Sequence, residues 1–249
     1  MDPLILVALA GVVAGAMNAL AGGGSFVSLP ALIAAGVSPV LANTSSTVAL
    51  YPGGMASAWA YRDGLAGVGG VGLRSLLVVT LLGGIAGAFL LLHTPTRAFD
   101  AVLPWLLLMA SIALAFGRSL GDWMRARWRV GTGAVLCLQF GLGIYGGYFG
   151  GAVGIMMMAV WGLLGVRDIK TMQPPRTLMV TAANTMAVLI FIFAGAVQWR
   201  ETLVMLVAAI VGGYGGALLG KRIPAPVIRA GTLLLTAFIT VAFFMRAYG

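Results

Sequence analysis

Four long segments of the chain contain no acidic or basic side chain, at residues 3–61, 130–166, 177–199 and 230–245. A water-exposed surface needs charges at much shorter intervals, because about a quarter of the residues in soluble globular domains are charged. Here only 8% of the 249 residues are charged and 61% are hydrophobic. The sequence therefore predicts an integral membrane protein without a sizeable soluble domain.

The few polar side chains exclude several classes of function. A single cysteine, Cys137, and a single histidine, His93, cannot supply a zinc or haem site. We find no Ser-His-Asp arrangement, P-loop or pair of intramembrane carboxylates, so we expect no enzyme activity, no metal and no cofactor. The excess of 15 Lys and Arg over 6 Asp and Glu is typical of cytoplasmic loops, and we do not expect a nucleic-acid partner.

Apolar runs recur in the same order in the two halves of the chain. The first half has runs at residues 4–20, 26–35, 40–60, 71–92 and 101–116, and the second at residues 131–149, 155–164, 177–194, 203–219 and 227–244. The second run of each half is long enough for only about half a bilayer, at about 1.5 Å per residue. Each half is thus predicted to be a re-entrant or broken helical hairpin followed by three transmembrane helices.

These halves define the predicted domains: repeat 1 at residues 1–120, a basic cytoplasmic linker at 121–130, and repeat 2 at 131–249. Glycine clusters precede both short runs, GGGS at residues 22–25 and GGAVG at residues 150–154. Both runs end in Gly-Val about 129 residues apart. Coincidence among 37 glycines that pack helices is the alternative, but the shared order of all features favours an internal repeat.

Basic residues predict the orientation in the membrane. Residues 118–129 contain four arginines, which places this stretch in the cytoplasm. Counting spans from there puts both termini outside, leaving only Arg97, Arg200 and Arg246 of the Lys and Arg residues on the outer side. An odd number of runs in each half requires the halves to be inverted relative to each other, an architecture typical of secondary transporters.

The glycine clusters are predicted to line a cavity, because non-helical backbone at membrane depth must be satisfied by protein or by water. Each cluster leads into a half-helix, whose first N–H groups and partial positive charge attract anions. Ser25 is expected either to cap the first half-helix or to offer its hydroxyl to the ligand. A second group of glycines is expected only to pack helices closely: Gly11, Gly15, Gly83, Gly84 and Gly87.

The long helix after each half-helix carries further polar residues, at residues 43–47 in the first half and from Gln173 to Asn184 in the second. Hydroxyls can bond to the carbonyl one turn earlier. The amides of Asn43 and Asn184 need a partner across helices or a cavity. Arg176 follows a Pro-Pro pair expected to interrupt the helix, and it is either an inner-face topology residue or the counter-charge for an anion.

These segments resemble the two repeats of the TauE/SafE family of sulfite and organosulfonate exporters. The similarity lies in AGAMNALAGGGSFVSLPALIAAGVSPVLANTSSTVAL, in GIYGGYFGGAVGIMMMAVWGLLGV and in FAGAVQW, and it spans nearly the whole chain. It is most specific in the first repeat, with its glycine triplet, Pro30 half-helix, Gly36-x-x-Pro39 turn and residues 42–45. The second repeat departs from the pattern of the first at Ala152-Val153 and at residues 173–176. The resemblance therefore does not imply equal roles for the two repeats.

The resemblance implies a bacterial inner-membrane exporter of small sulfur-containing anions, and the sequence predicts that the anion is held between the hairpin tips. An anion-selective channel, a permease for another oxyanion or carboxylate, and a scaffold without a ligand remain alternatives. The expected partners are the anion and the lipid bilayer, and the oligomeric state is left open. The candidate substrate-binding residues are Asn18, Gly22, Gly23, Gly24, Ser25, Asn43, Thr44, Ser45, Gly150, Gly151, Gly154, Gln173, Arg176 and Asn184.

Overall fold

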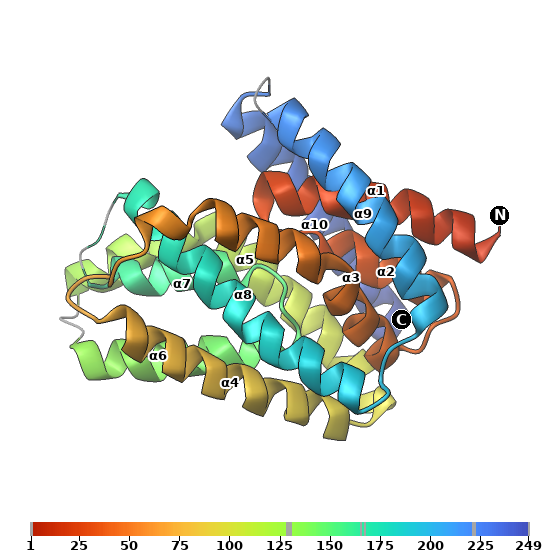
Figure 1. Ribbon diagram of the computed structural model, residues 1–249, viewed down its shortest axis with the longest axis horizontal. Helices are drawn as coiled ribbons and strands as arrows, with labels where there is room; N and C mark the ends of the chain where they lie inside the picture. The colour runs from red at the N-terminus through yellow and green to blue at the C-terminus, as the bar shows by residue number, and fades with distance from the viewer. Residues whose placement is uncertain (1, 128–130, 165, 167, 221–222, 249) are drawn as a thin grey trace.

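The computed structural model describes residues 2–127, 131–164, 166, 168–220 and 223–248, and its regular elements there are helices (Figure 1). The first half comprises α1 (Pro3–Ala21), α2 (Ser25–Ala34), α3 (Pro39–Ala60), the short 3₁₀ helix η1 (Arg62–Gly64), α4 (Leu73–His93) and α5 (Thr96–Arg127). The second half comprises α6 (Thr132–Tyr148), α7 (Val153–Gly162), α8 (Ile169–Phe193), α9 (Trp199–Gly220) and α10 (Ala225–Tyr248). The predicted all-α polytopic membrane fold is confirmed.

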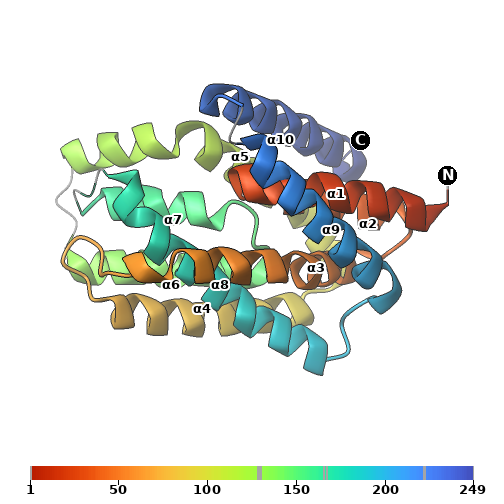
Figure 2. The same ribbon diagram turned by 45° about the horizontal axis from the view of Figure 1, so that its top comes forward.

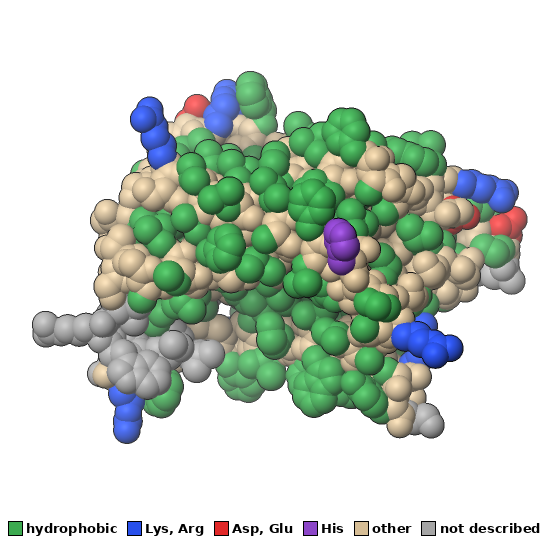
Figure 3. Space-filling model, turned by 90° about the horizontal axis from the view of Figure 1, so that it is seen from below, with side chains coloured by type: hydrophobic (Ala, Val, Ile, Leu, Met, Phe, Trp, Pro, Cys, Tyr) green, Lys and Arg blue, Asp and Glu red, His purple; other side chains and the backbone are tan. Residues whose placement is uncertain are grey.

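Within the described residues, six helices are long and apolar enough to span a bilayer: α1, α4, α5, α8, α9 and α10. Both predicted half-helices are present, since α2 and α7 have 10 residues each. On the face seen in Figure 3, hydrophobic side chains are spread over the middle, and Lys, Arg, Asp and Glu side chains lie at the margins. The helix α3 has 22 residues but carries the polar segment, which suits a helix that lines a site.

Two helices extend beyond the runs expected from hydropathy. The helix α5 continues to Arg127, past the predicted end at Phe116, because the basic stretch still contains good helix formers and no proline. The helix α8 begins at Ile169 and runs through Pro174 and Pro175, so the predicted interruption is wrong. These prolines lie in the second turn, where they remove only hydrogen bonds to carbonyls near the helix start.

Some of the predicted features fall on residues that the structure leaves undescribed. They are Gly165 of the second Gly-Val pair and four of the basic residues expected on the inner side, Arg129, Arg167, Lys221 and Arg222.

The two halves pack through equivalent helix pairs (Figures 1 and 2). The most extensive contacts join α1 to α9 and α4 to α6, and exchanging the halves converts one pair into the other. The same exchange relates α4–α8 to α3–α9, whereas α5–α7 is much more extensive than its counterpart α10–α2. This pattern supports two repeats, and their inversion in the membrane stays a prediction. Both termini lie toward the same end of the long axis, as that prediction requires.

Close backbone contacts explain the glycines in these crossings. A Cβ on Gly15 would lie 2.0 Å from the carbonyl oxygen of Ala209, between α1 and α9. In the equivalent α4–α6 crossing, a Cβ on Gly87 would lie 2.1 Å from the carbonyl oxygen of Ile144. Gly11, Gly83 and Gly84 also face backbone of the neighbouring helix within 3 Å. The predicted packing role of these five glycines is confirmed.

This packing leads to a stability prediction for Gly15→Ala. The added methyl group must separate α1 from α9, and overpacking of this kind costs about 1–3 kcal/mol. We expect a clearly lower melting temperature in detergent. Gly215→Ala is the control on α9, since a Cβ there meets no atom within 4 Å and alanine favours the helix. Equal melting temperatures for the two variants would contradict the packing role.

Candidate functional site

The hairpin turns of the two halves have related backbone geometry. Gly22 follows α1 with a φ of 73°, and Gly150 follows α6 with a φ of 80°. Both values lie in the left-handed region, which glycine adopts without steric cost. In the second turn Ala152 also has a positive φ, 56°, a strained conformation for a residue with a side chain. Each turn reverses the chain and directs the start of a half-helix toward the interior.

Ser25 is the first residue of α2 and not its cap. Gly24 occupies the cap position, and no side chain caps this helix. Of the two roles expected for Ser25, capping is therefore excluded. Its side chain is partly exposed and forms no hydrogen bond to another described residue. The hydroxyl can thus reach a ligand at the first tip.

The side chain of Arg176 lies between the two hairpin tips. A Cβ on Gly22 would be 2.9 Å from Nη2 of Arg176, and a Cβ on Gly154 would be 2.5 Å from its Nε. Only glycine at both positions leaves room for the guanidinium. Residues from the first tip, the second tip and α8, which are far apart in the sequence, therefore meet at one cation.

No carboxylate neutralises this cation among the described residues. Nη1 of Arg176 donates a hydrogen bond to Oε1 of Gln173 at 3.0 Å. Its Nε is buried and has no hydrogen-bond partner. The ion pairs of the described residues, Arg62–Asp63 and Arg246–Asp100, involve other arginines. A charge withdrawn from water without a counter-charge costs free energy, so this site is suited to an anionic ligand.

One asparagine from each half lies beside the hairpin turn of that half. Oδ1 of Asn184 is buried without a hydrogen-bond partner and lies 3.7 Å from the position of a Cβ on Gly150. Asn18, near the end of α1, approaches Gly24, since a Cβ there would lie 3.0 Å from the Cβ of Asn18. Each asparagine thus places an amide next to a hairpin turn.

The polar start of α3 is occupied by contacts within the protein. Nδ2 of Asn43 donates to the carbonyl of Tyr148 at 2.8 Å. The hydroxyl of Thr44 donates to the carbonyl of Ala196, and Oγ of Ser45 accepts a 2.9 Å hydrogen bond from the N–H of Gln198. These three candidate side chains therefore bind backbone of the protein, Asn43 beside the second hairpin turn and Thr44 and Ser45 at the turn between α8 and α9.

Two remaining tip glycines differ in their surroundings. Gly151 faces the ring of Phe149, 2.5 Å from a Cβ position, whereas Gly23 meets only ordinary contacts at 3.4 Å or more. Gly53 of α3 was absent from the candidate residues. It is exposed and lies 3.7 Å, measured from a Cβ position, from Nδ2 of Asn18. The sequence feature that could have indicated Gly53 is the Pro-Gly-Gly sequence inside a membrane-length helix.

Comparison with known proteins now decides the family. The sequence profile described as "Sulfite exporter TauE/SafE" matches residues 7–243. The chain belongs to the TauE/SafE family. The family assignment predicted from the sequence is confirmed.

Curated relatives of this TauE/SafE chain are named as membrane transporters. The "Probable membrane transporter protein" of Haemophilus influenzae is 29% identical over 248 residues, covering 95% of this chain and 94% of the relative. The "Probable membrane transporter protein YfcA" of Escherichia coli K12 is 31% identical over 244 residues, covering 96% and 87%. "Probable membrane transporter protein ORF9" of a Sinorhizobium species is 28% identical over 246 residues, covering 96% and 89%. No solved structure matches the chain significantly.

The TauE/SafE chain is therefore a multi-pass membrane transporter whose two hairpin tips meet at a half-buried arginine. The tips offer backbone N–H groups at the start of two half-helices, and the arginine adds a full positive charge. Such an arrangement can hold a small oxyanion without a metal or cofactor.

Proposed function

We propose that this protein exports a small sulfur-containing oxyanion, sulfite or a short organosulfonate, across the bacterial inner membrane. Arg176 acts as its counter-charge, and the tips at residues 22–25 and 150–154 supply further donors. One observation carries the proposal: Arg176 is a half-buried cation whose Nε is buried, has no hydrogen-bond partner and lies against both tips. Asn18, Gln173 and Asn184 complete the first contacts around the anion, while Asn43, Thr44 and Ser45 bind backbone of the protein and not the anion.

The negative charge of the proposed ligand follows from the charges around Arg176. An intramembrane ionisable residue is costly and usually pairs with a substrate or another charge. Arg176 has a neutral partner, Gln173, and no acidic partner in the described part of the chain. A bound oxyanion would accept from the unpaired Nε and from the half-helix N–H groups, and hydrogen bonds to charged groups each contribute about 1.5–3 kcal/mol.

The membrane potential suffices to drive export. At about 2.3 kcal/mol per charge per 100 mV, an inside-negative potential favours outward movement of a monovalent anion by about 50-fold. The proposed mechanism therefore requires no coupling ion and no catalytic step.

A flux assay in liposomes tests this proposal. Purified protein is reconstituted and compared with empty vesicles for uptake of sulfite, sulfoacetate, thiosulfate, sulfate and chloride under an imposed potential. We expect saturable flux of sulfite or sulfoacetate and little flux of chloride. Fast flux without saturation would support a channel, and equal leakage of all five anions or no flux would overturn the proposal.

The proposed topology makes a separate prediction for the loops. In Cys137→Ala protein, a cysteine at Ala66, after α3, is expected to react only with reagents on the cytoplasmic side, and one at Pro95, between α4 and α5, only from outside. Labelling with a membrane-impermeant maleimide in intact cells measures this difference. Reaction of the cysteine at Ala66 from outside would contradict the assigned orientation.

A further inference from the structure

The start of α3 and the turn between α8 and α9 form a closed contact at one end of the molecule. Thr44 and Ser45 of α3 bind the backbone of Ala196 and Gln198 in this turn. Both side chains are fully buried, with 0% of their surface exposed. We call this contact, made by Thr44, Ser45, Ala196 and Gln198, the outer clasp, because the predicted topology places it outside.

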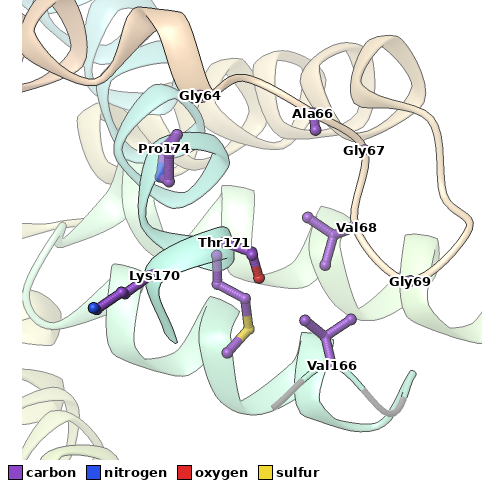
Figure 4. Close-up of a pocket in the computed structure, with 10 residues that line it drawn as sticks. Gly64, Ala66, Gly67, Val68, Gly69, Val166, Lys170, Thr171 and Pro174 are labelled. Atoms are coloured by element: carbon purple, nitrogen blue, oxygen red, sulfur yellow. The ribbon is translucent and has the colours of Figure 1, made fainter. Parts of the chain in front are cut away.

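The exchange of the two halves relates the outer clasp to a second contact, between the start of α8 and the segment that follows α3. Here a pocket of about 520 Å³ lies between the two surfaces, which still meet at one side of it, where a Cβ on Gly64 would lie 2.8 Å from Cγ of Pro174. Its walls are residues 64 and 66–69 on one side and Val166 with residues 170–172 and 174 on the other. Figure 4 shows Val68 and Val166 facing each other across the space, while Lys170 points away from it. We call this contact the inner clasp.

The inner clasp leads toward the proposed anion site. Pro174, in the pocket wall, precedes Arg176 by less than one turn of α8. Gln173, next to it, holds the Arg176 guanidinium. The facing segment starts directly after Tyr61, which follows the end of α3. The pocket therefore lies beside the chain that positions the cation.

We infer that Thr44 and Ser45 gate the outer end of the route to Arg176, and that the structure represents an inward-open state with the outer clasp closed and the inner clasp open. This inference rests on the proposed function and topology. Inverted repeats allow two states in which the related contacts exchange roles, because each half can adopt the conformation of the other. In the outward-open state the hydrogen bonds of Thr44 and Ser45 are broken and the pocket at the inner clasp is closed.

The hydroxyls set the balance between the two states. Removing both eliminates two hydrogen bonds that exist only when the outer clasp is closed, which shifts the equilibrium toward the outward-open state by about 10- to 30-fold. Thr47 provides a matched control, because its hydroxyl bonds at 2.9 Å to the carbonyl of Asn43 within α3 and not to the clasp.

Cysteine accessibility tests the gate without needing the substrate. The reporter is a cysteine at Ala49 in Cys137→Ala protein, one turn deeper in α3 than Ser45 and only 2% exposed. We expect Thr44→Val with Ser45→Ala to increase its labelling by an external impermeant maleimide about tenfold or more. Thr47→Val should leave labelling of the Ala49 cysteine unchanged. Serine at position 44 keeps the hydroxyl, so labelling should again be slow when Thr44→Ser takes the place of Thr44→Val.

A second cysteine, at Ala66 in the inner clasp, should react more slowly from the cytoplasmic side in the same double variant. Unchanged labelling at both positions in folded protein would overturn the inference. Increased labelling at Ala49 together with faster labelling at Ala66 would also overturn it, because that result indicates loosening and not alternation. The predicted labelling pattern without flux of any oxyanion would support the gate and overturn the proposed substrate.

Discussion

Arg176→Gln is expected to raise the dissociation constant of the transported anion by about 100-fold and to reduce flux accordingly. The substitution removes the positive charge and the Nε–H group that lies free between the tips. Charge-assisted hydrogen bonds of this kind contribute about 1.5–3 kcal/mol, and about 2.7 kcal/mol corresponds to a factor of 100. Glutamine is shorter than arginine but keeps a donor, so the cavity stays polar.

The same substitution should leave the melting temperature without ligand unchanged or raise it. A buried charge without a counter-charge destabilises a fold, and its replacement by a neutral group is neutral or stabilising. A residue with a purely structural role would give the opposite result, because its loss would lower stability. Arg176 is therefore expected to lose binding and gain or keep stability, a combination that distinguishes a ligand-binding residue.

Anion-dependent thermal stabilisation measures both quantities, since a ligand that binds only the folded state raises the melting temperature with its concentration. Arg176→Lys should fall between wild type and Arg176→Gln, because lysine keeps the charge and loses the planar fork. Arg62→Gln is the matched control, an exposed arginine paired with Asp63. If Arg176→Gln and Arg176→Lys both bind the anion as wild type does, Arg176 is not its counter-charge, and only the role of an inner-face residue that sets the membrane topology remains.

The sequence predicted the helical architecture because its strongest features, uncharged runs and glycine clusters, each depend on the residues of a single helix or turn. Uncharged runs define the spans, and glycine clusters define the breaks at α2 and α7. Hydropathy did not predict the extension of α5 to Arg127, since a helix continues into water wherever its residues favour helix and its backbone stays bonded. The prolines of α8 do not interrupt it, because the effect of a proline depends on its distance from the helix start.

The site was predicted less completely because it depends on contacts between distant segments. The sequence indicated that Arg176 has two alternative roles, and only its contacts with Gly22 and Gly154 favour the anion role. Thr44 and Ser45 could not be separated from ligand-binding residues by type, since their hydroxyls bond to a turn more than 150 residues away. Gly24 also combines two roles, because a Cβ there would lie 2.5 Å from the carbonyl oxygen of Ala14, so alanine at this position perturbs packing as well as binding.

Gly154→Ala reduces that ambiguity, because a Cβ there would meet side chains and no backbone, Arg176 and Cγ2 of Val180 at 3.1 Å. It is expected to weaken anion binding by at least about tenfold. The new methyl group would lie 2.5 Å from Nε of Arg176 and 3.1 Å from Nη2, so the guanidinium must leave the space between the tips. Moving one charged donor out of hydrogen-bonding geometry costs about 1.5 kcal/mol or more, which is roughly a tenfold loss. Gly162→Ala, at the other end of α7, is the control, because a Cβ there meets no atom within 4 Å.

The effect of Gly154→Ala can be assigned to Arg176 with a double-mutant cycle. If the methyl group acts only by displacing the guanidinium, adding Gly154→Ala to Arg176→Gln should change the dissociation constant little, so that the two effects are strongly non-additive. Fully additive losses would mean that Gly154 contacts the anion through its own backbone, independently of Arg176. Unchanged anion-dependent stabilisation in Gly154→Ala alone would remove the second tip from the site and leave Gly22, Ser25 and Asn18 of the first half as the remaining contacts. Because each variant is compared with its own melting temperature without anion, a general loss of stability cannot imitate either result.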